Sequence, residues 1–320
     1  MEIYEAKEFH PRVALFIASE KGYEILLAAI NLDIDIGFIV GFQESNVSES
    51  FSNHIIECAS NKAIHYIDWE HIKSNLAENI INYNISHCIA AGWKYLLPKS
   101  INELLVHPLI IFHDSILPKY RGFCPTPTAL LKGETKIGMT VLFASEQADK
   151  GPIIHQEEVE ISDTCLIQEA IHIQCELYRK SLKKLRPMLY KKEIQSAPQD
   201  ESKASYSIWR DPIDCNINWN KDAKSIFNLI RAVSKPYSGA YTFLDNKKIY
   251  IWNAQLCEDL EFEVRYPGKI WRIDEEGKPE IVCGKGLIKL INVSYEDGIN
   301  VIFKYTRKRL GQLNGLSPQD

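Results

Sequence analysis

The continuous apolar run Val13–Ala18 (VALFIA) decides the expected fold, because it is the first of several short strand-like segments. A strand that is apolar at every position is typical of a parallel sheet covered by helices on both faces. Strand-like and helix-like segments then alternate from about residue 12 to residue 190. Further strands are expected at 34–40, 64–67, 87–91 and 109–112, with helices at 24–30, 51–61 and 69–82. This rhythm predicts an α/β, Rossmann-like domain with a parallel sheet.

A polar stretch without periodicity, residues 196–205, separates this part from the rest of the chain and is the best linker candidate. We therefore expect two domains, one over residues 1–195 and a smaller one over residues 206–320. The second part has one helix-like segment followed by short strands separated by turn residues. This pattern predicts a mostly β, barrel-like C-terminal domain.

Composition narrows the function classes. The 320 residues carry a formal net charge of −5, which gives no electrostatic reason for strong binding to nucleic acid or to an anionic membrane. No apolar run is long enough to cross a bilayer, and the acidic N-terminus is unlike a signal peptide. The eight cysteines form no Cys-x-x-Cys pair, so we expect free thiols in a cytoplasmic protein and no metal site. Neither a Gly-x-Gly-x-x-Gly fingerprint nor a Walker loop is present, which argues against NAD and ATP.

The stretch His113–Gly122 (HDSILPKYRG) carries the main chemical signal. His113 ends a strand, at the edge where open α/β sheets place their ligands. Asp149 follows between two strand-like runs and is a candidate partner that would fix the imidazole tautomer and stabilise its protonated form. Taken alone, a histidine and an aspartate in such positions are more often structural than catalytic.

These residues resemble a known family. HDSILPKYRG is similar to the His-x-Ser-Leu-Leu-Pro-x-x-Arg-Gly motif of the 10-formyltetrahydrofolate-dependent formyltransferases. Residues 138–141 (GMTV) and 149–154 (DKGPII) match the second block of that family at the expected separation. Residues 230–241 (IRAVSKPYSGAY) resemble the start of the C-terminal domain in methionyl-tRNA and sugar formyltransferases.

The resemblance implies an enzyme that moves a formyl group from 10-formyltetrahydrofolate, as cosubstrate, to an amine. His113 would transfer the proton between the attacking amine and the leaving nitrogen, and Asp149 would orient His113. The residues that would bind the folate are Gly92, Trp93, Leu96, Ile116, Leu117, Pro118, Arg121 and Ala144. Packing is an equally good interpretation of Trp93, and Arg121 would hold either the loop or an anionic ligand. Trp209, Arg210, Tyr237 and Tyr241 could line a nucleotide or sugar pocket, although core packing is the stronger prior for each one.

One position departs from the family pattern. The family usually has an asparagine two residues before its histidine, where it donates to the oxyanion, and here that residue is Ile111. Losing one such donor typically costs ~10²–10³ in turnover. Asp114 and Ser115 are adjacent candidates for compensation, but a charged Asp114 would repel an oxyanion.

The acceptor amine is expected to belong to a small molecule. We favour an amino group of a nucleotide-linked amino-deoxysugar, as in polysaccharide biosynthesis, and a homodimer is typical of such enzymes. Methionyl-tRNA is the alternative. Residues 201–320, however, hold 18 Lys and Arg against 16 Asp and Glu, and a domain with so little positive charge is poorly suited to bind a polyanion such as tRNA. A second alternative, motivated by Ile111, is a folate-binding protein that has lost catalysis.

Overall fold

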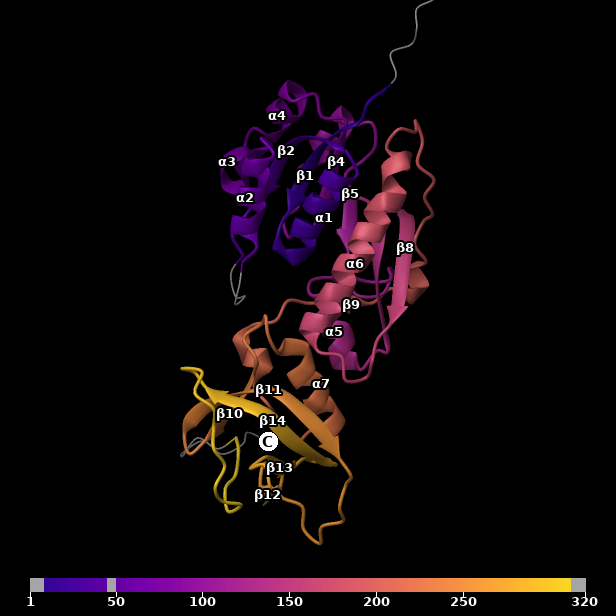
Figure 1. Ribbon diagram of the computed structural model, residues 1–320. Helices are drawn as coiled ribbons and strands as arrows, with labels where there is room; N and C mark the ends of the chain where they lie inside the picture. The colour runs from indigo at the N-terminus through magenta and orange to yellow at the C-terminus, as the bar shows by residue number, and fades with distance from the viewer. Residues whose placement is uncertain (1–8, 45–49, 312–320) are drawn as a thin grey trace, which may run out of the picture.

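A seven-stranded sheet forms the centre of the N-terminal lobe in the computed structural model, which describes residues 9–44 and 50–311 (Figure 1). Its strands lie in the order β3-β2-β1-β4-β5-β7-β8. They are β1 (Arg12–Ile17), β2 (Asp35–Gly41), β3 (His65–Asp68), β4 (His87–Ala91), β5 (Ile110–His113), β7 (Lys136–Phe143) and β8 (Ile153–Glu160). The apolar run that starts at Val13 forms β1, and its side chains are fully buried because helices cover both faces of the sheet.

The predicted parallel sheet is confirmed for five strands and is wrong for two. Strands β1 to β5 pair in parallel, whereas β7 pairs antiparallel with β5, and β8 pairs antiparallel with β7. The helix between β5 and β7, α5 (Pro125–Lys132), packs mainly on a helix of the C-terminal lobe and not across the sheet. Without a helical crossover over the sheet, the chain returns beside β5 in the opposite direction.

Helices of unequal length cover the two faces of the sheet. The α1 (Ser19–Asn31), α2 (Ser52–Asn61) and α6 (Ile167–Leu185) helices cover one face, and α3 (Trp69–Ile72) and α4 (Leu76–Asn82) cover the other. The single helix expected at 69–82 is therefore two short helices. Within the described ranges, no helix is both long and apolar enough to cross a membrane.

The C-terminal lobe is a five-stranded antiparallel sheet with one helix, α7 (Ala223–Val233). Its strands are β10 (Ala240–Leu244), β11 (Lys247–Cys257), β12 (Ile270–Ile273), β13 (Pro279–Val282) and β14 (Leu287–Tyr295), in the order β10-β11-β14-β13-β12. Residues 308–311 lie between the two edge strands, because the Ile270 N–H donates to Lys308 and the Gly311 N–H donates to Phe243. The sheet thereby curves back on itself, and the predicted barrel-like architecture is confirmed.

The stretch expected to be a linker is packed against the N-terminal lobe. Ala197 bridges to Ile153 of β8, and β9 (Tyr206–Ser207) pairs with β6 (Arg121–Gly122). Between the lobes, the buried guanidinium of Arg231 donates to the carbonyl groups of Leu130 and Cys165. The connection is therefore ordered, and the boundaries at residues 195 and 206 stay predictions.

Candidate functional site

His113 is the last residue of β5, and strand alternation places its side chain on the sheet face that also carries Ile111. The side chain is only 8% exposed. Its Nε2 lies 3.0 Å from the carbonyl oxygen of Tyr120, and its Nδ1 lies 3.5 Å from Oδ1 of Asp149. Because both neighbours are acceptors, only the doubly protonated ring donates to both. The two acceptors therefore hold the imidazole ring in one orientation.

Asp149 is fixed by its own backbone and by the loop after His113. Its φ is 58°, a left-handed conformation that aspartate adopts more readily than most residues. Its Oδ2 accepts a hydrogen bond of 2.7 Å from the N–H of Gly122. The loop after β7 thus folds back to the carboxyl end of β5, and the structure brings the two sequence motifs together.

A side chain that the sequence analysis did not single out supports the Asp149 loop. The Gln199 amide nitrogen donates to the carbonyl groups of Asp149 and Gly151, at 2.7 and 2.8 Å. The Gln199 amide oxygen accepts from the guanidinium of Arg121, which is 1% exposed and also forms two hydrogen bonds with Glu201. Of the two roles expected for Arg121, the structure supports holding the loop. No local pattern near Gln199 signals this contact, because its partners lie about 50 and 80 residues earlier.

The residue after His113 has a different environment. Asp114 forms a buried ion pair with Lys21 of α1, and it accepts a hydrogen bond from the hydroxyl group of Tyr178 on α6. Burial would raise the pKa of the Asp114 carboxyl, but the Lys21 cation and these hydrogen bonds outweigh burial and lower it. Burial tends to lower the pKa of Lys21, but Asp114 outweighs it and raises that pKa. Asp114 is therefore ionised, and the positive charge of Lys21 balances its negative charge.

Three of the expected folate-binding residues follow β4. Gly92 has a φ of 61°, and a Cβ there would lie 2.3 Å from the carbonyl oxygen of Ala18, so glycine is required. Trp93 packs edge-on in an aromatic cluster, yet its indole N–H is buried and has no hydrogen-bond partner among the described residues. Leu96 is 81% exposed, which is unusual for a large apolar side chain.

The other expected folate-binding residues do not share one wall. Ala144 packs against the same core layer as Trp93, and its N–H donates to the carbonyl oxygen of Leu109, just before β5. Ile116 instead lies against Gly138 and lines a separate cavity of about 210 Å³. Leu117 is buried, with its N–H donating to the Thr140 hydroxyl, and the Pro118 carbonyl accepts from Ser205.

The position of the missing asparagine has no donor side chain. Ile111 is half-buried and packs against the core layer beneath α3 and α4. The two compensating candidates are engaged elsewhere, since Asp114 pairs with Lys21 and the Ser115 hydroxyl donates to the Lys119 carbonyl at 2.6 Å. Neither candidate is therefore shown to replace the asparagine.

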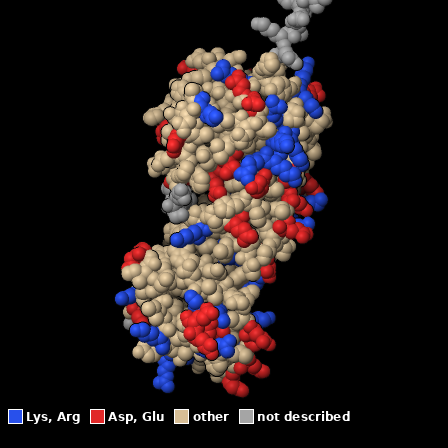
Figure 2. All heavy atoms as spheres, viewed as in Figure 1, with Lys and Arg blue, Asp and Glu red and all other residues tan. Residues whose placement is uncertain are grey.

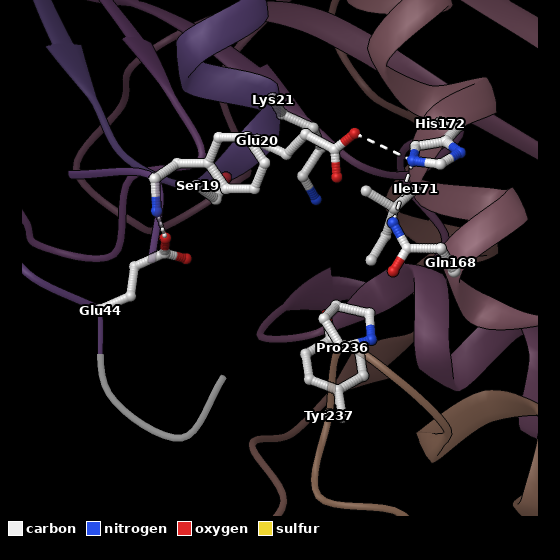
Figure 3. A pocket seen from close by; sticks show the side chains of 10 residues that line it. Ser19, Glu20, Lys21, Glu44, Gln168, Ile171, His172, Pro236 and Tyr237 are labelled. Carbon is white, nitrogen blue, oxygen red and sulfur yellow. Dashed lines mark hydrogen bonds and ion pairs between the residues drawn. The ribbon is translucent and has the colours of Figure 1, made fainter. Parts of the chain in front are cut away.

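A cavity of about 300 Å³ lies between the lobes, and we call it the inter-lobe cavity (Figure 3). The side chains that line it include Glu20, Lys21, Glu44, Gln168, His172 and Tyr237. Tyr237 is the one expected substrate-binding residue among its lining residues. Trp209 is 63% exposed, Arg210 donates to Thr128, and Tyr241 packs beside Phe243 and Tyr250 on the outer sheet face.

Comparison with protein-family models gives two matches. The model described as formyl transferase matches residues 44–171, and the model described as formyl transferase, C-terminal domain, matches residues 211–302. Together they cover well over half of the chain, in the order in which the two lobes follow each other.

Solved structures share this fold at low identity. HypX from Aquifex aeolicus in complex with tetrahydrofolic acid has a TM-score of 0.62 at 15% identity; the match covers 92% of this chain and 46% of HypX. The chain thus spans about half the length of HypX. The N-formyltransferase from Helicobacter canadensis with folinic acid and dTDP-3-aminofucose has a TM-score of 0.65 at 18% identity, covering 88% of this chain and 98% of that one. Methionyl-tRNA formyltransferase from Clostridium thermocellum has a TM-score of 0.57 at 14% identity, covering 78% and 94%.

Proposed function

The chain belongs to the formyl transferase family, and from this premise we propose that it transfers a formyl group from 10-formyltetrahydrofolate to an amine. The observation that carries the proposal is the position of His113 between Asp149 and the Tyr120 carbonyl, at the carboxyl end of β5. Ligands of open α/β sheets bind at this edge.

The reaction moves one proton from the acceptor nitrogen to N10 of the folate. A bond forms between the acceptor nitrogen and the formyl carbon, and the bond between that carbon and N10 breaks. The acceptor nitrogen loses a proton, and N10 gains one. His113 carries this proton. For this step its Nε2 leaves the carbonyl oxygen of Tyr120 and forms a hydrogen bond with the reacting nitrogen. Such general acid–base catalysis typically contributes ~10²–10⁴ in rate.

Asp149 gives the imidazole its orientation. Its carboxylate is 14% exposed, faces Nδ1 of His113 and is itself held by the Gly122 N–H. When His113 takes up the proton, the nearby carboxylate stabilises the resulting positive charge. The hydrogen bonds from Gln199 keep the Asp149 backbone in place during this exchange.

The loop after β4 suits a flat ring that offers hydrogen-bond acceptors. The buried indole N–H of Trp93 is a donor without a partner among the described residues, and Leu96, three residues further on, is an exposed apolar side chain. When bound, 10-formyltetrahydrofolate supplies the formyl group. Among the described residues, no cluster of three or more potential metal ligands is present.

An amino group on a nucleotide-linked deoxysugar is the acceptor that we favour. The inter-lobe cavity adjoins the Asp114 end of the motif loop and is lined by polar side chains that suit a hydroxylated ring. The structurally similar Helicobacter protein was solved with such a ligand. Methionyl-tRNA is less well supported, because acidic side chains gather beside the basic ones on the face of the C-terminal lobe drawn in Figure 2.

The direct test offers 10-formyltetrahydrofolate together with dTDP-3-aminofucose, other nucleotide-linked amino sugars and methionyl-tRNA, each in a separate assay. We expect formylated sugar, detected by mass spectrometry, and no formylated tRNA. A protein that binds folinic acid in calorimetry but formylates no amine would instead be the folate-binding protein that Ile111 suggests.

A further inference from the structure

A buried polar network lies on the sheet face opposite to the His113 side chain. Asp114 pairs with Lys21 of α1 and accepts a hydrogen bond from the hydroxyl group of Tyr178 on α6. The side chains of Lys21 and Asp114 are 12% and 16% exposed, and Tyr178 is 1% exposed. Burying two charges is costly, and apolar side chains of similar size often stabilise a fold as well. Stability alone therefore does not account for the network.

Two side chains of α6 hold the backbone on both sides of His113. The Tyr178 hydroxyl group donates to the carbonyl oxygen of Phe112 at 3.0 Å, and the side-chain nitrogen of Gln174 donates to the carbonyl oxygen of Asp114 at 3.4 Å. Residues four apart lie on the same face of a helix, so both side chains reach the end of β5. The α6 helix therefore fixes the backbone that carries the imidazole.

The charge of Asp114 matters to His113 because the two side chains interact electrostatically. Asp149 already favours the protonated imidazole from the other side. A second carboxylate without a partner would favour that form further and hinder the release of the proton. The Lys21 cation prevents this, since an ion pair acts on a neighbouring charge much less than a lone carboxylate does.

Other titratable groups lie around the ion pair, and these are Glu20 of α1, Glu44 after β2, Cys124 before α5, Cys175 of α6 and Tyr237 of the C-terminal lobe. Desolvation raises the pKa of Cys175 and of Tyr237 to about 12 and also raises that of Cys124, so these three groups are uncharged near neutral pH. Glu20 pairs with His172, and burial raises the pKa of Glu44. Lys21 is therefore the group that balances the charge of Asp114.

We propose that the buried network of Lys21, Asp114 and Tyr178 positions His113 and keeps its imidazole able to release a proton. Asp114 orients the Tyr178 hydroxyl group at the end of β5, and Lys21 cancels the charge that Asp114 would otherwise add beside the imidazole. This inference rests on the proposed function, because it concerns the support of the residue to which proton transfer is assigned.

The test separates charge from position with three variants. Asp114→Asn leaves the Lys21 cation unbalanced, Lys21→Met/Asp114→Asn removes both charges, and Tyr178→Phe removes a hydroxyl group without changing any charge. The first readout is the pKa of His113, followed by NMR titration of its ring protons without substrate and assigned by their absence in His113→Ala. The second readout is kcat and KM for formyl transfer. Lys183→Met, which removes an exposed lysine from α6, is the matched control and should leave both readouts unchanged.

We expect Asp114→Asn to lower the pKa of His113 by about half a unit or more, because the unbalanced cation disfavours the protonated ring. The double variant should return this pKa to within about 0.2 units of wild type, since no charge remains. Tyr178→Phe should leave the pKa of His113 unchanged and lower kcat about tenfold, because misplaced catalytic groups lose rate steeply. Its KM and its affinity for folinic acid should change less than twofold.

A purely structural role would destabilise the variants without a shift that reverses in the double variant. An unchanged pKa of His113 in folded Asp114→Asn, or a shift that persists in the double variant, would overturn the inference. If Asp114→Asn does not fold, Tyr178→Phe decides, and a wild-type kcat in that variant would overturn it as well. The titration needs no acceptor, so a wild-type protein that shows the expected shifts but formylates no amine would refute the proposed function alone.

Discussion

His113, the last residue of β5, and Asp114, which follows it, face opposite sides of the sheet. His113 faces the layer of Ile111 and contacts Asp149, whereas Asp114 faces α1 and α6 and contacts Lys21 and Tyr178. Both pairs join a carboxylate to a cationic or basic group, but their surroundings differ. The His113 and Asp149 side chains are 3.5 Å apart, whereas Asp114 accepts hydrogen bonds from both Lys21 and Tyr178, and the Lys21 cation lowers the pKa of its carboxyl group.

This contrast shows how a single strand end can place two ion pairs in different surroundings. Alternation of side chains along a strand directs neighbouring residues to different faces. His113 thereby lies on the sheet face of Ile111 and Trp93, and Lys21 lies at the inter-lobe cavity.

The largest expected effect comes from removing His113 or Asp149, the pair to which we assign proton transfer. His113→Ala and Asp149→Ala should each lower the rate of formyl transfer by ~10²–10⁴, because general acid–base catalysis is lost. Steady-state kinetics and circular dichroism check the rate and the fold. Rates close to wild type in either variant would remove that residue from the mechanism.

Restoring the missing oxyanion donor, near His113, should raise the rate of formyl transfer. Ile111→Asn should raise kcat by up to ~10², since one such donor is typically worth ~10²–10³. Ile111→Leu is the matched control and should leave kcat unchanged. A folded Ile111→Asn variant whose kcat does not rise would show that another group already stabilises the oxyanion.

A smaller effect is expected from the side chain that supports the Asp149 loop. Gln199→Ala removes two hydrogen bonds to that loop and should lower kcat about tenfold, because misplaced catalytic groups lose rate steeply. Gln199→Glu keeps the shape but loses the donor nitrogen, and it should behave like the alanine variant. Activity that survives in both variants would mean that Gly122 alone positions Asp149.

The smallest expected effect is a change in the stability of the fold, caused by a residue that belongs to neither ion pair. Glu157 on β8 is hydrogen-bonded by Lys180, Lys184 and His155, which outweigh burial and lower its pKa to about 2. A carboxyl group with a lowered pKa stabilises the fold above its unfolded pKa, near 4.5, and this contribution disappears as the pH falls towards 2. Glu157→Gln should therefore be less stable than wild type at pH 7 and approach it at pH 2, as urea unfolding would show. A constant difference across this range would contradict the assigned cause.

The sequence predicts the strands of the first lobe well, because a strand buried on both faces of a sheet is apolar at every position, as Val13–Ala18 is. It also predicts that His113 and Asp149 lie near each other, through two motifs with a typical separation. It does not predict the direction of β7, because direction depends on where α5 packs. Lys21 and Gln199 also stay hidden, since each meets its partner across about 50 residues or more, and neither contact leaves a periodic pattern.

A double-mutant cycle on the rate of formyl transfer tests most directly whether His113 and Asp149 act as one unit. The rates of wild type, His113→Ala, Asp149→Ala and the double variant are measured with one acceptor. We expect the double variant to be no slower than the slower single variant, because residues that act as a unit are strongly non-additive. Losses that multiply in the double variant would show independent roles and contradict the mechanism.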